Sequence, residues 1–286
     1  MGCAVSEKQL DAIQKRILPL ILKNRFGNIV ELSDEINTDF FWNYKVKQAE
    51  EIIKKADEVF NGKLAVAFSG GKDSLTVLHL VLKTIPDVIV LYNNTTIEFP
   101  ETIEYVKKLS KLWNFNLEIT RPKDTFFKLL KIHGWATHED RWCCGPCKEE
   151  PAAKFIKDHG IQAEITGTTR TESIYRRGLK PIKLPSKRPY FIRINPIYDW
   201  NSQEVWKYIE TQKLPCNPIY EMGYRRCGCW CCPINGPSHY SRLEKTHPKH
   251  FNCLMRYRYM NPQIIQLLEK RRLKAEANIG NALQSS

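Results

Sequence analysis

The sequence predicts an α/β fold in which helices cover both faces of a doubly wound, mostly parallel sheet. Between residue 63 and about residue 166, short apolar runs of strand length alternate with longer segments whose apolar residues recur at helical spacing. The first apolar run, 64–68, leads directly through a glycine loop into a helical segment. A chain of 286 residues that is 42% hydrophobic can bury the core this fold needs.

Two amphipathic helices are predicted before the first strand. One covers residues 7 to about 24, and the other runs from Tyr44 to about Phe60. The Asn61-Gly62 pair is typical of a helix C-terminus, where the backbone turns left-handed. We expect both helices to have a packing role and to form an N-terminal helical extension, 1–62.

The body of the fold is predicted over residues 63–212, and ligands of such sheets bind at the carboxyl ends of the strands. Three loops lie at those ends: 69–74, 93–99 and 167–177. A later helix is expected with Ser202 as its N-cap. The predicted strands are 64–68, 88–92, 117–119 and 163–166, and the predicted helices between them begin near 75, 100, 125 and 148.

A different texture is found in the last segment, 213–286. Residues 213–238 are rich in Pro, Gly and Cys and show no periodicity, as in a loop that is functional or held by a metal. The following residues are expected to form basic helices. We therefore expect a cysteine-rich loop followed by a helical region.

The composition limits the classes of function. No apolar run is long enough to span a bilayer and no apolar signal core is present, so we expect a cytoplasmic protein. The net charge of +13 suits a polyanion such as tRNA or DNA, although a generally basic surface would give the same number. Ten cysteines without an export signal favour metal or redox chemistry over a disulfide framework.

The loop Ser69-Gly70-Gly71-Lys72-Asp73-Ser74 has the features of a phosphate site. Its glycines let the backbone approach phosphate oxygens, the first helix amides are free, and Lys72 adds positive charge. It lacks the four-residue spacer of a Walker A loop, and a tight strand-to-helix turn is the plainer alternative. The loop resembles the S-G-G-x-D-S motif of the PP-loop family, the ATP pyrophosphatases. That resemblance implies an adenine nucleotide alpha-hydrolase-like fold. It also implies an enzyme that cleaves ATP between the α and β phosphates, with Mg²⁺ bound beside Asp73.

Further segments narrow the resemblance to relatives of phosphoadenylyl-sulfate (PAPS) reductase. They are 94–102, 168–177, 195–200, 205–209 and 217–224, so that the resemblance covers about residues 60–235. The arginines of the second segment can fork to phosphate or sulfate oxygens, although a solvated charged loop is the alternative. We expect nucleotide contacts from Ser69, Gly70, Gly71, Lys72, Asp73, Ser74, Thr95, Gly167, Arg170, Ser173 and Arg177.

Two groups of cysteines lie about eighty residues apart, so the fold must bring them together if they act jointly. Cys143, Cys144, Cys229 and Cys232 resemble the C-C…C-x-x-C pattern of the cluster-containing adenylyl-sulfate reductases, which implies a [4Fe–4S] cluster. Thiolates also suit structural zinc, but adjacent cysteines are unusual for zinc. The roles of Cys147, Cys216, Cys227 and Cys231 stay open among alternative ligands, redox thiols and sulfur carriers.

Three functions are consistent with these motifs. The favoured one is ATP-dependent adenylylation followed by sulfur transfer to tRNA or DNA, because the phosphate loop is intact and the E-C-G-x-H motif of the reductases is not found. The second is reduction of PAPS or adenylyl sulfate to sulfite, with the arginines on the sulfate and Cys253 or one of the surplus cysteines as nucleophile. The third is a nucleotide and cluster sensor without turnover.

The same motifs imply partners and catalytic residues. A protein that donates sulfur or electrons is expected, and the resemblance is compatible with a homodimer. The candidate catalytic residues are Lys72, Asp73, Arg170, Arg176 and Cys253.

Overall fold

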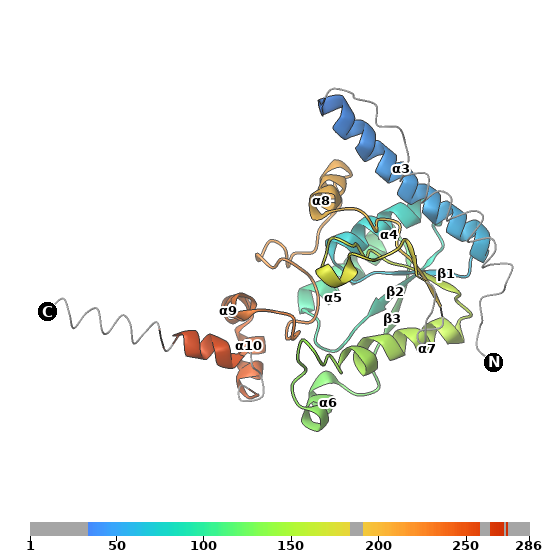
Figure 1. The fold of residues 1–286 in the computed structure, drawn as a ribbon. Helices are drawn as coiled ribbons and strands as arrows, with labels where there is room; N and C mark the ends of the chain where they lie inside the picture. The colour runs from blue at the N-terminus through green and yellow to red at the C-terminus, as the bar shows by residue number, and fades with distance from the viewer. Residues whose placement is uncertain (1–33, 184–190, 258–263, 272, 274–286) are drawn as a thin grey trace.

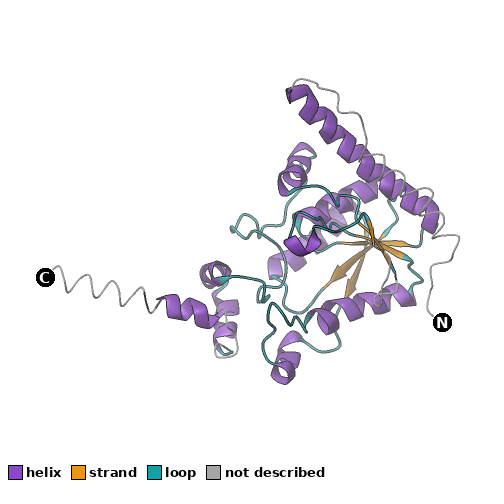
Figure 2. Ribbon diagram, viewed as in Figure 1, coloured by secondary structure: helices purple, strands orange, loops and turns teal. Residues whose placement is uncertain are grey.

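The computed structural model describes residues 34–183, 191–257, 264–271 and 273. The helix predicted at residues 7–24 lies outside this range. The described part contains a mixed sheet with helices on both faces, so the predicted fold class is confirmed (Figure 2).

The sheet has the strand order β3-β2-β1-β4-β6-β5 among the described residues. Its neighbours pair in parallel except for β5 and β6, which are antiparallel. The strands are β1 (Leu64–Ala67), β2 (Ile89–Asn93), β3 (Asn116–Thr120), β4 (Ala163–Ile165), β5 (Ile182–Lys183) and β6 (Ile192–Ile194).

The helices lie close to the predicted positions. Pro100 and Trp113 bound α5 as the periodicity predicts. The helix predicted to begin near 148 instead starts as a π-helical turn, η3. The helices of this part are α3 (Asp34–Phe60), α4 (Lys72–Thr84), α5 (Pro100–Trp113), α6 (Phe126–His133), η3 (Gly145–Glu149), α7 (Glu150–Asp158), η4 (Ile174–Arg176), α8 (Ser202–Thr211), α9 (Pro237–Thr246) and α10 (Pro248–Met255), and residues 264–271 are also helical.

Two local predictions need correction. The N-cap of α8 is Asn201 and not Ser202: its side chain accepts from the amides of Gln203 and Glu204, and the Glu204 carboxylate bonds back in a capping box. The helix before β1 begins at Asp34, ten residues earlier than its apolar periodicity indicates, and it ends as expected at the left-handed pair Asn61-Gly62.

The two faces of the sheet are covered by different helices. On β1, Leu64 and Val66 belong to a large core with α3, α4, α5 and α8, whereas Ala65 points to the opposite face and packs with α7. Figure 1 shows α7 on one side of the sheet and α3 and α4 on the other. The central strands are therefore buried on both faces, which explains their uninterrupted apolar runs.

The chain reverses its direction of growth across the sheet at β1. From β1 it proceeds outward to β2 and β3, and it then returns to add β4 on the other edge of β1. The loops that follow β1 and β4 therefore diverge, and such a switch point is where open α/β sheets bind ligands. These loops contain residues 69–74 and 167–177.

A second hydrophobic core lies beside the sheet. It joins Phe99, α6, the cysteine-rich loop, α9, α10 and the helix at 264–271. Most of the described cysteines belong to it or pack against it. The cysteine-rich loop thus has a core of its own, next to the carboxyl ends of the strands.

Candidate active site

The loop after β1 has the backbone of an anion site. Gly70 has a φ of +76°, and Gly71 stands at the N-cap of α4 without a side-chain cap. A Cβ on Gly70 would lie 2.9 Å from Cγ2 of Thr102, so both the conformation and the space require glycine. The 13-residue helix α4 therefore begins at a glycine loop, and a ligand can closely approach the free amides of its first turn.

The Ser74 hydroxyl holds this loop closed. It accepts from the Ser69 amide at 3.2 Å and donates to the carbonyl oxygen of Gly71 at 2.9 Å. The Ser69 hydroxyl lies 3.1 Å from the Ser74 hydroxyl. The two predicted serines, Ser69 and Ser74, therefore stabilise the conformation of the loop by hydrogen bonds to each other and to its backbone.

Gly167 joins the second loop to the first. A Cβ there would lie 2.6 Å from the carbonyl carbon and oxygen of Asp73 and 2.7 Å from the Ser74 nitrogen. These neighbours are backbone atoms at the start of α4, which cannot rotate away. The loop after β4 therefore packs at its first residues against the start of α4.

Lys72 and Asp73 form an ion pair, with the Lys72 Nζ 2.7 Å from Oδ1 of Asp73. The backbone N–H of Lys72 donates to the Tyr220 hydroxyl at 2.8 Å. Burial raises the pKa of that hydroxyl, which keeps it neutral. Tyr220 therefore contacts the phosphate loop, a role that its place in a Pro-rich loop does not reveal.

Asn217 is a second residue that sequence analysis did not single out as part of the site. It is 1% exposed, and its Nδ2 donates to the Gly70 carbonyl at 3.1 Å and to the Thr102 hydroxyl at 3.0 Å. Its Oδ1 accepts from the Ile219 amide. The sequence contains no signal for Asn217 other than the N-P-I-Y segment, because Gly70 and Thr102, to which its Nδ2 donates, lie more than a hundred residues away.

The predicted arginine segment forms an open loop after β4. The guanidinium of Arg170 lies 5.3 Å from the Tyr198 ring centroid, and Arg176 pairs with Glu172. Arg177 is exposed, and Ser173 stands at the N-cap of η4 without a side-chain cap bond. Arg170 and Arg177 are thus exposed at the carboxyl edge of the sheet.

The four predicted cluster cysteines lie in one neighbourhood. The thiol of Cys143 is hydrogen-bonded to Cys144 and is electrostatically coupled to Cys229 and Cys232. That hydrogen bond lowers the pKa of Cys144 to about 6, and together with burial it raises the pKa of Cys143. The fold therefore brings the two sequence groups together.

Cys229 links this neighbourhood to the loop after β2. Its Sγ lies 3.3 Å from the Thr95 hydroxyl, and it contacts Oε1 of Glu98 at 3.7 Å. Burial raises the pKa of Glu98 and of Cys229. Thr95, expected among the nucleotide contacts, thus lies on the cysteine side of the site.

The chemistry of this neighbourhood fits an iron–sulfur cluster. Its donors are four soft thiols, of which those of Cys143, Cys144 and Cys229 belong to the second core or pack against it. The Nε1 atoms of Trp135 and Trp142 in the same core have no hydrogen-bond partner among the described residues. Indole N–H groups can donate to cluster sulfur atoms. No three His, Cys, Asp or Glu side chains of the described chain converge closely enough to hold a single metal ion.

The remaining cysteines occupy different places. Cys227 lies beside the phosphate loop, with its Cβ 3.9 Å from where a Cβ on Gly71 would be. Cys231 is fully buried and coupled to Cys229, Cys232 and Cys253. The thiol of Cys253 is on α10, where burial raises its pKa, and it packs against the second core.

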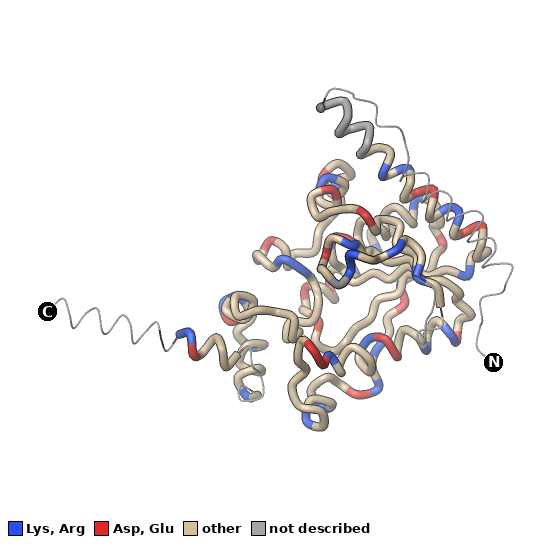
Figure 3. Tube along the Cα trace, in the orientation of Figure 1, with Lys and Arg blue, Asp and Glu red and all other residues tan. Residues whose placement is uncertain are grey.

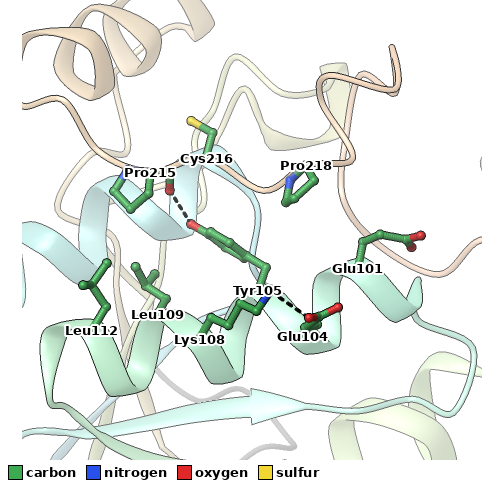
Figure 4. Close-up of a pocket in the computed structure, with 9 residues that line it drawn as sticks. All are labelled: Glu101, Glu104, Tyr105, Lys108, Leu109, Leu112, Pro215, Cys216 and Pro218. Atoms are coloured by element: carbon green, nitrogen blue, oxygen red, sulfur yellow. Dashed lines mark hydrogen bonds and ion pairs between the residues drawn. The ribbon is translucent and has the colours of Figure 1, made fainter.

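A groove of about 440 Å³ lies on the outer side of α5 (Figure 4). Tyr105 crosses it and donates to the carbonyl oxygen of Pro215 at 2.8 Å. None of the phosphate-loop residues lines it. The candidate active site is therefore the edge at the switch point and not this groove.

Residues of both charges occur along the described chain (Figure 3). Lys and Arg alternate with Asp and Glu along α3 and α7 (Figure 3). Arg225 and Arg226 are exposed in the cysteine-rich loop, next to Cys227. Within the described residues, no helix is both long enough and apolar enough to cross a membrane.

Comparison with known protein families gives a match over residues 63–235 to the phosphoadenosine phosphosulfate reductase domain. The chain belongs to this family. The match begins at the residue before β1 and ends within the cysteine-rich loop, so it includes both the phosphate loop and the predicted cluster cysteines.

Several curated proteins are similar to this member of the family. Two uncharacterized proteins of Methanocaldococcus jannaschii are 32% and 33% identical over 92% and 78% of the chain, and the matched segments span 65% and 48% of their lengths. An adenosine 5'-phosphosulfate reductase of Bacillus cereus is 28% identical over 71% of the chain and 87% of its own length.

Solved structures show the same fold. The PAPS reductase of Candida auris, in a phosphate complex, superposes with a TM-score of 0.54 at 25% identity, covering 72% of this chain and all of that one. The FMN adenylyltransferase of Candida glabrata gives 0.54 at 19% identity, with 80% of this chain and 73% of that chain covered. The second likeness concerns the fold alone.

Proposed function

We propose that this member of the PAPS reductase family uses ATP to adenylylate an oxygen of its substrate and then replaces that oxygen with sulfur. The observation that carries the proposal is the intact phosphate loop, with Gly70 left-handed, Gly71 at the N-cap and Lys72 in the first turn of α4. Gly167 packs on the same helix start. Such a site suits a pyrophosphate leaving group.

Each residue of the loop has a role in this proposal. The amides of α4 and the Nζ of Lys72 hold the β and γ phosphates and stabilise the charge that develops as the bond to the α phosphate breaks. In this proposal Asp73, which pairs with Lys72, binds Mg²⁺. Arg170 and Arg177, in the loop after β4, contact the nucleotide.

The sulfur chemistry is assigned to the cysteine neighbourhood. Cys143, Cys144, Cys229 and Cys232 would hold a [4Fe–4S] cluster, which when bound supplies a place to carry sulfur. The low pKa of Cys144 supports its role as a ligand, since thiolates bind iron. The four thiols and the adjacent cysteine pair are also the reason to prefer a cluster over zinc.

Positive charge is the argument for the proposed sulfur acceptor. The net charge of +13 and the exposed pair Arg225–Arg226 beside the cysteine-rich loop support tRNA or DNA as the sulfur acceptor. A donor protein would renew the sulfur. A homodimer is compatible with this arrangement.

Pyrophosphate release tests the proposal. Protein purified without oxygen is incubated with ATP, Mg²⁺ and bulk tRNA. We expect pyrophosphate to be released, and Lys72→Ala to reduce the rate at least about a hundredfold, as for loss of one transition-state donor. Lys108→Ala, at an exposed position on α5, is the matched control. Equal rates in the two variants would refute the role of the loop.

Reduction of adenylyl sulfate or PAPS is the second candidate, and the similarity to the Bacillus cereus adenosine 5'-phosphosulfate reductase favours it. Here Arg170, Arg176 and Arg177 bind the sulfate, and Cys253 or another thiol attacks sulfur. Sulfite release with a thiol donor, lost in Cys253→Ser, would establish this function. Tight ATP binding with neither product would instead indicate a sensor.

A further inference from the structure

One hydroxyl connects the phosphate loop to a cysteine outside the predicted ligand set. The Tyr220 hydroxyl accepts the hydrogen bond of the Lys72 N–H at 2.8 Å, and it is also hydrogen-bonded to the Cys227 thiol. A Cβ on Gly71 would lie 3.5 Å from this hydroxyl and 3.9 Å from Cβ of Cys227. The loop, the hydroxyl and the thiol are therefore in direct contact.

The amide that Tyr220 occupies is one that a phosphate needs. The N–H of Lys72 is at the first residue of α4, where the amides have no partner within the helix. Phosphate oxygens bind such amides. One N–H makes one strong hydrogen bond, so the Tyr220 hydroxyl and a phosphate oxygen compete for it.

A second observation points to a ligand in the same region. Tyr92, at the carboxyl end of β2, is 1% exposed, and its hydroxyl has no hydrogen-bond partner among the described residues. Burial raises the pKa of this hydroxyl, and Glu98, Cys229 and Cys227 act on it in the same direction. A buried hydroxyl without a partner costs free energy, which a polar ligand group between the loop and the cysteines would recover.

We propose that Tyr220 is a positioning residue that competes with the nucleotide for the Lys72 amide, so that nucleotide binding releases the Cys227 thiol to face the bound nucleotide. This inference rests on the proposed nucleotide binding at residues 69–74. Because coupling between sites is reciprocal, a contact that holds Tyr220 at the loop weakens nucleotide binding. This role applies to Cys227, which lies beside Gly71, and not to Cys253, which lies on α10.

A double-mutant cycle tests the competition. The affinities for ATP with Mg²⁺ and for inorganic pyrophosphate are measured in Tyr220→Phe, Cys227→Ala and the double variant. We expect Tyr220→Phe to bind both ligands about three- to tenfold more tightly, since one competing hydrogen bond is lost. Cys227→Ala should bind more tightly in the same direction, and the double variant no more tightly than Tyr220→Phe.

The control is Tyr224→Phe, because the hydroxyl of Tyr224 in the unmodified protein bonds to Thr246 and not to the phosphate loop. Its affinities should equal those of the unmodified protein. In Tyr220→Phe the ring keeps its edge contact with Trp206, 5.2 Å between centroids, so the fold should persist. Thermal unfolding of each variant checks this.

The S–H stretching band of Cys227 reports the release directly. The band is identified by its loss in Cys227→Ala, and ATP should shift it to the frequency that it has in Tyr220→Phe. Unchanged affinity in Tyr220→Phe, weaker binding there, or a band that ATP does not shift would overturn the inference. Failure of every form to bind ATP would instead overturn the proposed function.

Discussion

At the scale of single residues, the site depends on glycines at positions where a Cβ atom would clash with its neighbours. Gly167 is such a position, because its α-carbon faces the backbone of Asp73 and Ser74 and not a flexible side chain. Gly70 combines a left-handed backbone with a close neighbour on α5. These glycines link β1, β4 and α4 at the switch point.

Gly167→Ala should therefore displace the start of α4. We expect a loss of stability of about 1–3 kcal/mol, as for other overpacked sites, and weaker ATP binding. Chemical denaturation and calorimetric titration measure the two effects. Gly178→Ala is the control, because nothing lies within 4 Å of a Cβ there. Similar stabilities and affinities in the two variants would contradict the close packing.

His239 should make the second core sensitive to acid. Burial lowers its pKa to about 4, while its Nε2 donates to the Trp230 carbonyl at 2.8 Å. The unfolded chain takes up a proton near pH 6.5, so stability is full above that pH and falls as the pH drops toward 4. The loss should be about 2–3 kcal/mol.

Denaturation between pH 7 and pH 4 measures this loss. His239→Gln should flatten the stability curve in that window, whereas His159→Gln, at an exposed position, should leave it unchanged. A curve of His239→Gln that follows the unmodified protein would show that another group is responsible.

At the scale of elements, the cysteine-rich loop completes the phosphate loop. Asn217 and Tyr220 come from the segment after α8 and bond to Gly70 and Lys72, about 150 residues earlier. The same segment leads to Cys227 and then to Cys229. One irregular stretch thus supports the phosphate loop and contains two of the proposed cluster cysteines, Cys229 and Cys232.

Asn217→Ala should loosen this connection. The buried Gly70 carbonyl and Thr102 hydroxyl would lose their shared donor, which should lower stability by about 1–3 kcal/mol. Nucleotide affinity should fall as well, because Gly70 is no longer fixed. Asn252→Ala, exposed on α10, is the control. An Asn217→Ala variant as stable as this control would contradict the role.

Local patterns predicted most of the elements but not the contacts between them. The run 64–68 and the loop 69–74 were recognisable because a buried strand, two glycines and a helix start follow one another. Strand β6 was missed, because it has three residues and its central Arg193 pairs with buried Glu164 from the neighbouring strand. The part of Tyr220 in the site could not be predicted, since a hydroxyl 148 residues from its donor leaves no local signal.

At the scale of the whole molecule, two cores meet at the proposed site. The sheet core positions the phosphate loop, and the second core positions the cysteines. Thr95 and Glu98 lie between them, in contact with Cys229. On the proposed function, nucleotide and sulfur chemistry would take place on adjacent sides of one edge.

Metal analysis tests the cysteine half. Protein purified without oxygen should contain about four iron and four sulfide atoms per chain and should be brown. Cys232→Ser should lose iron and the added stability that a bound cluster gives. Cys216→Ser, outside the four-cysteine neighbourhood, should keep both. A colourless protein with one zinc per chain would contradict the cluster.

The bond of ATP that breaks tests the central claim most directly. Phosphorus NMR of the protein incubated with ATP, Mg²⁺ and bulk tRNA distinguishes the two possible cleavages. We predict AMP and pyrophosphate as the products, since residues 69–74 are proposed to hold pyrophosphate as the leaving group. ADP and phosphate, or ATP that stays intact, would contradict the claim.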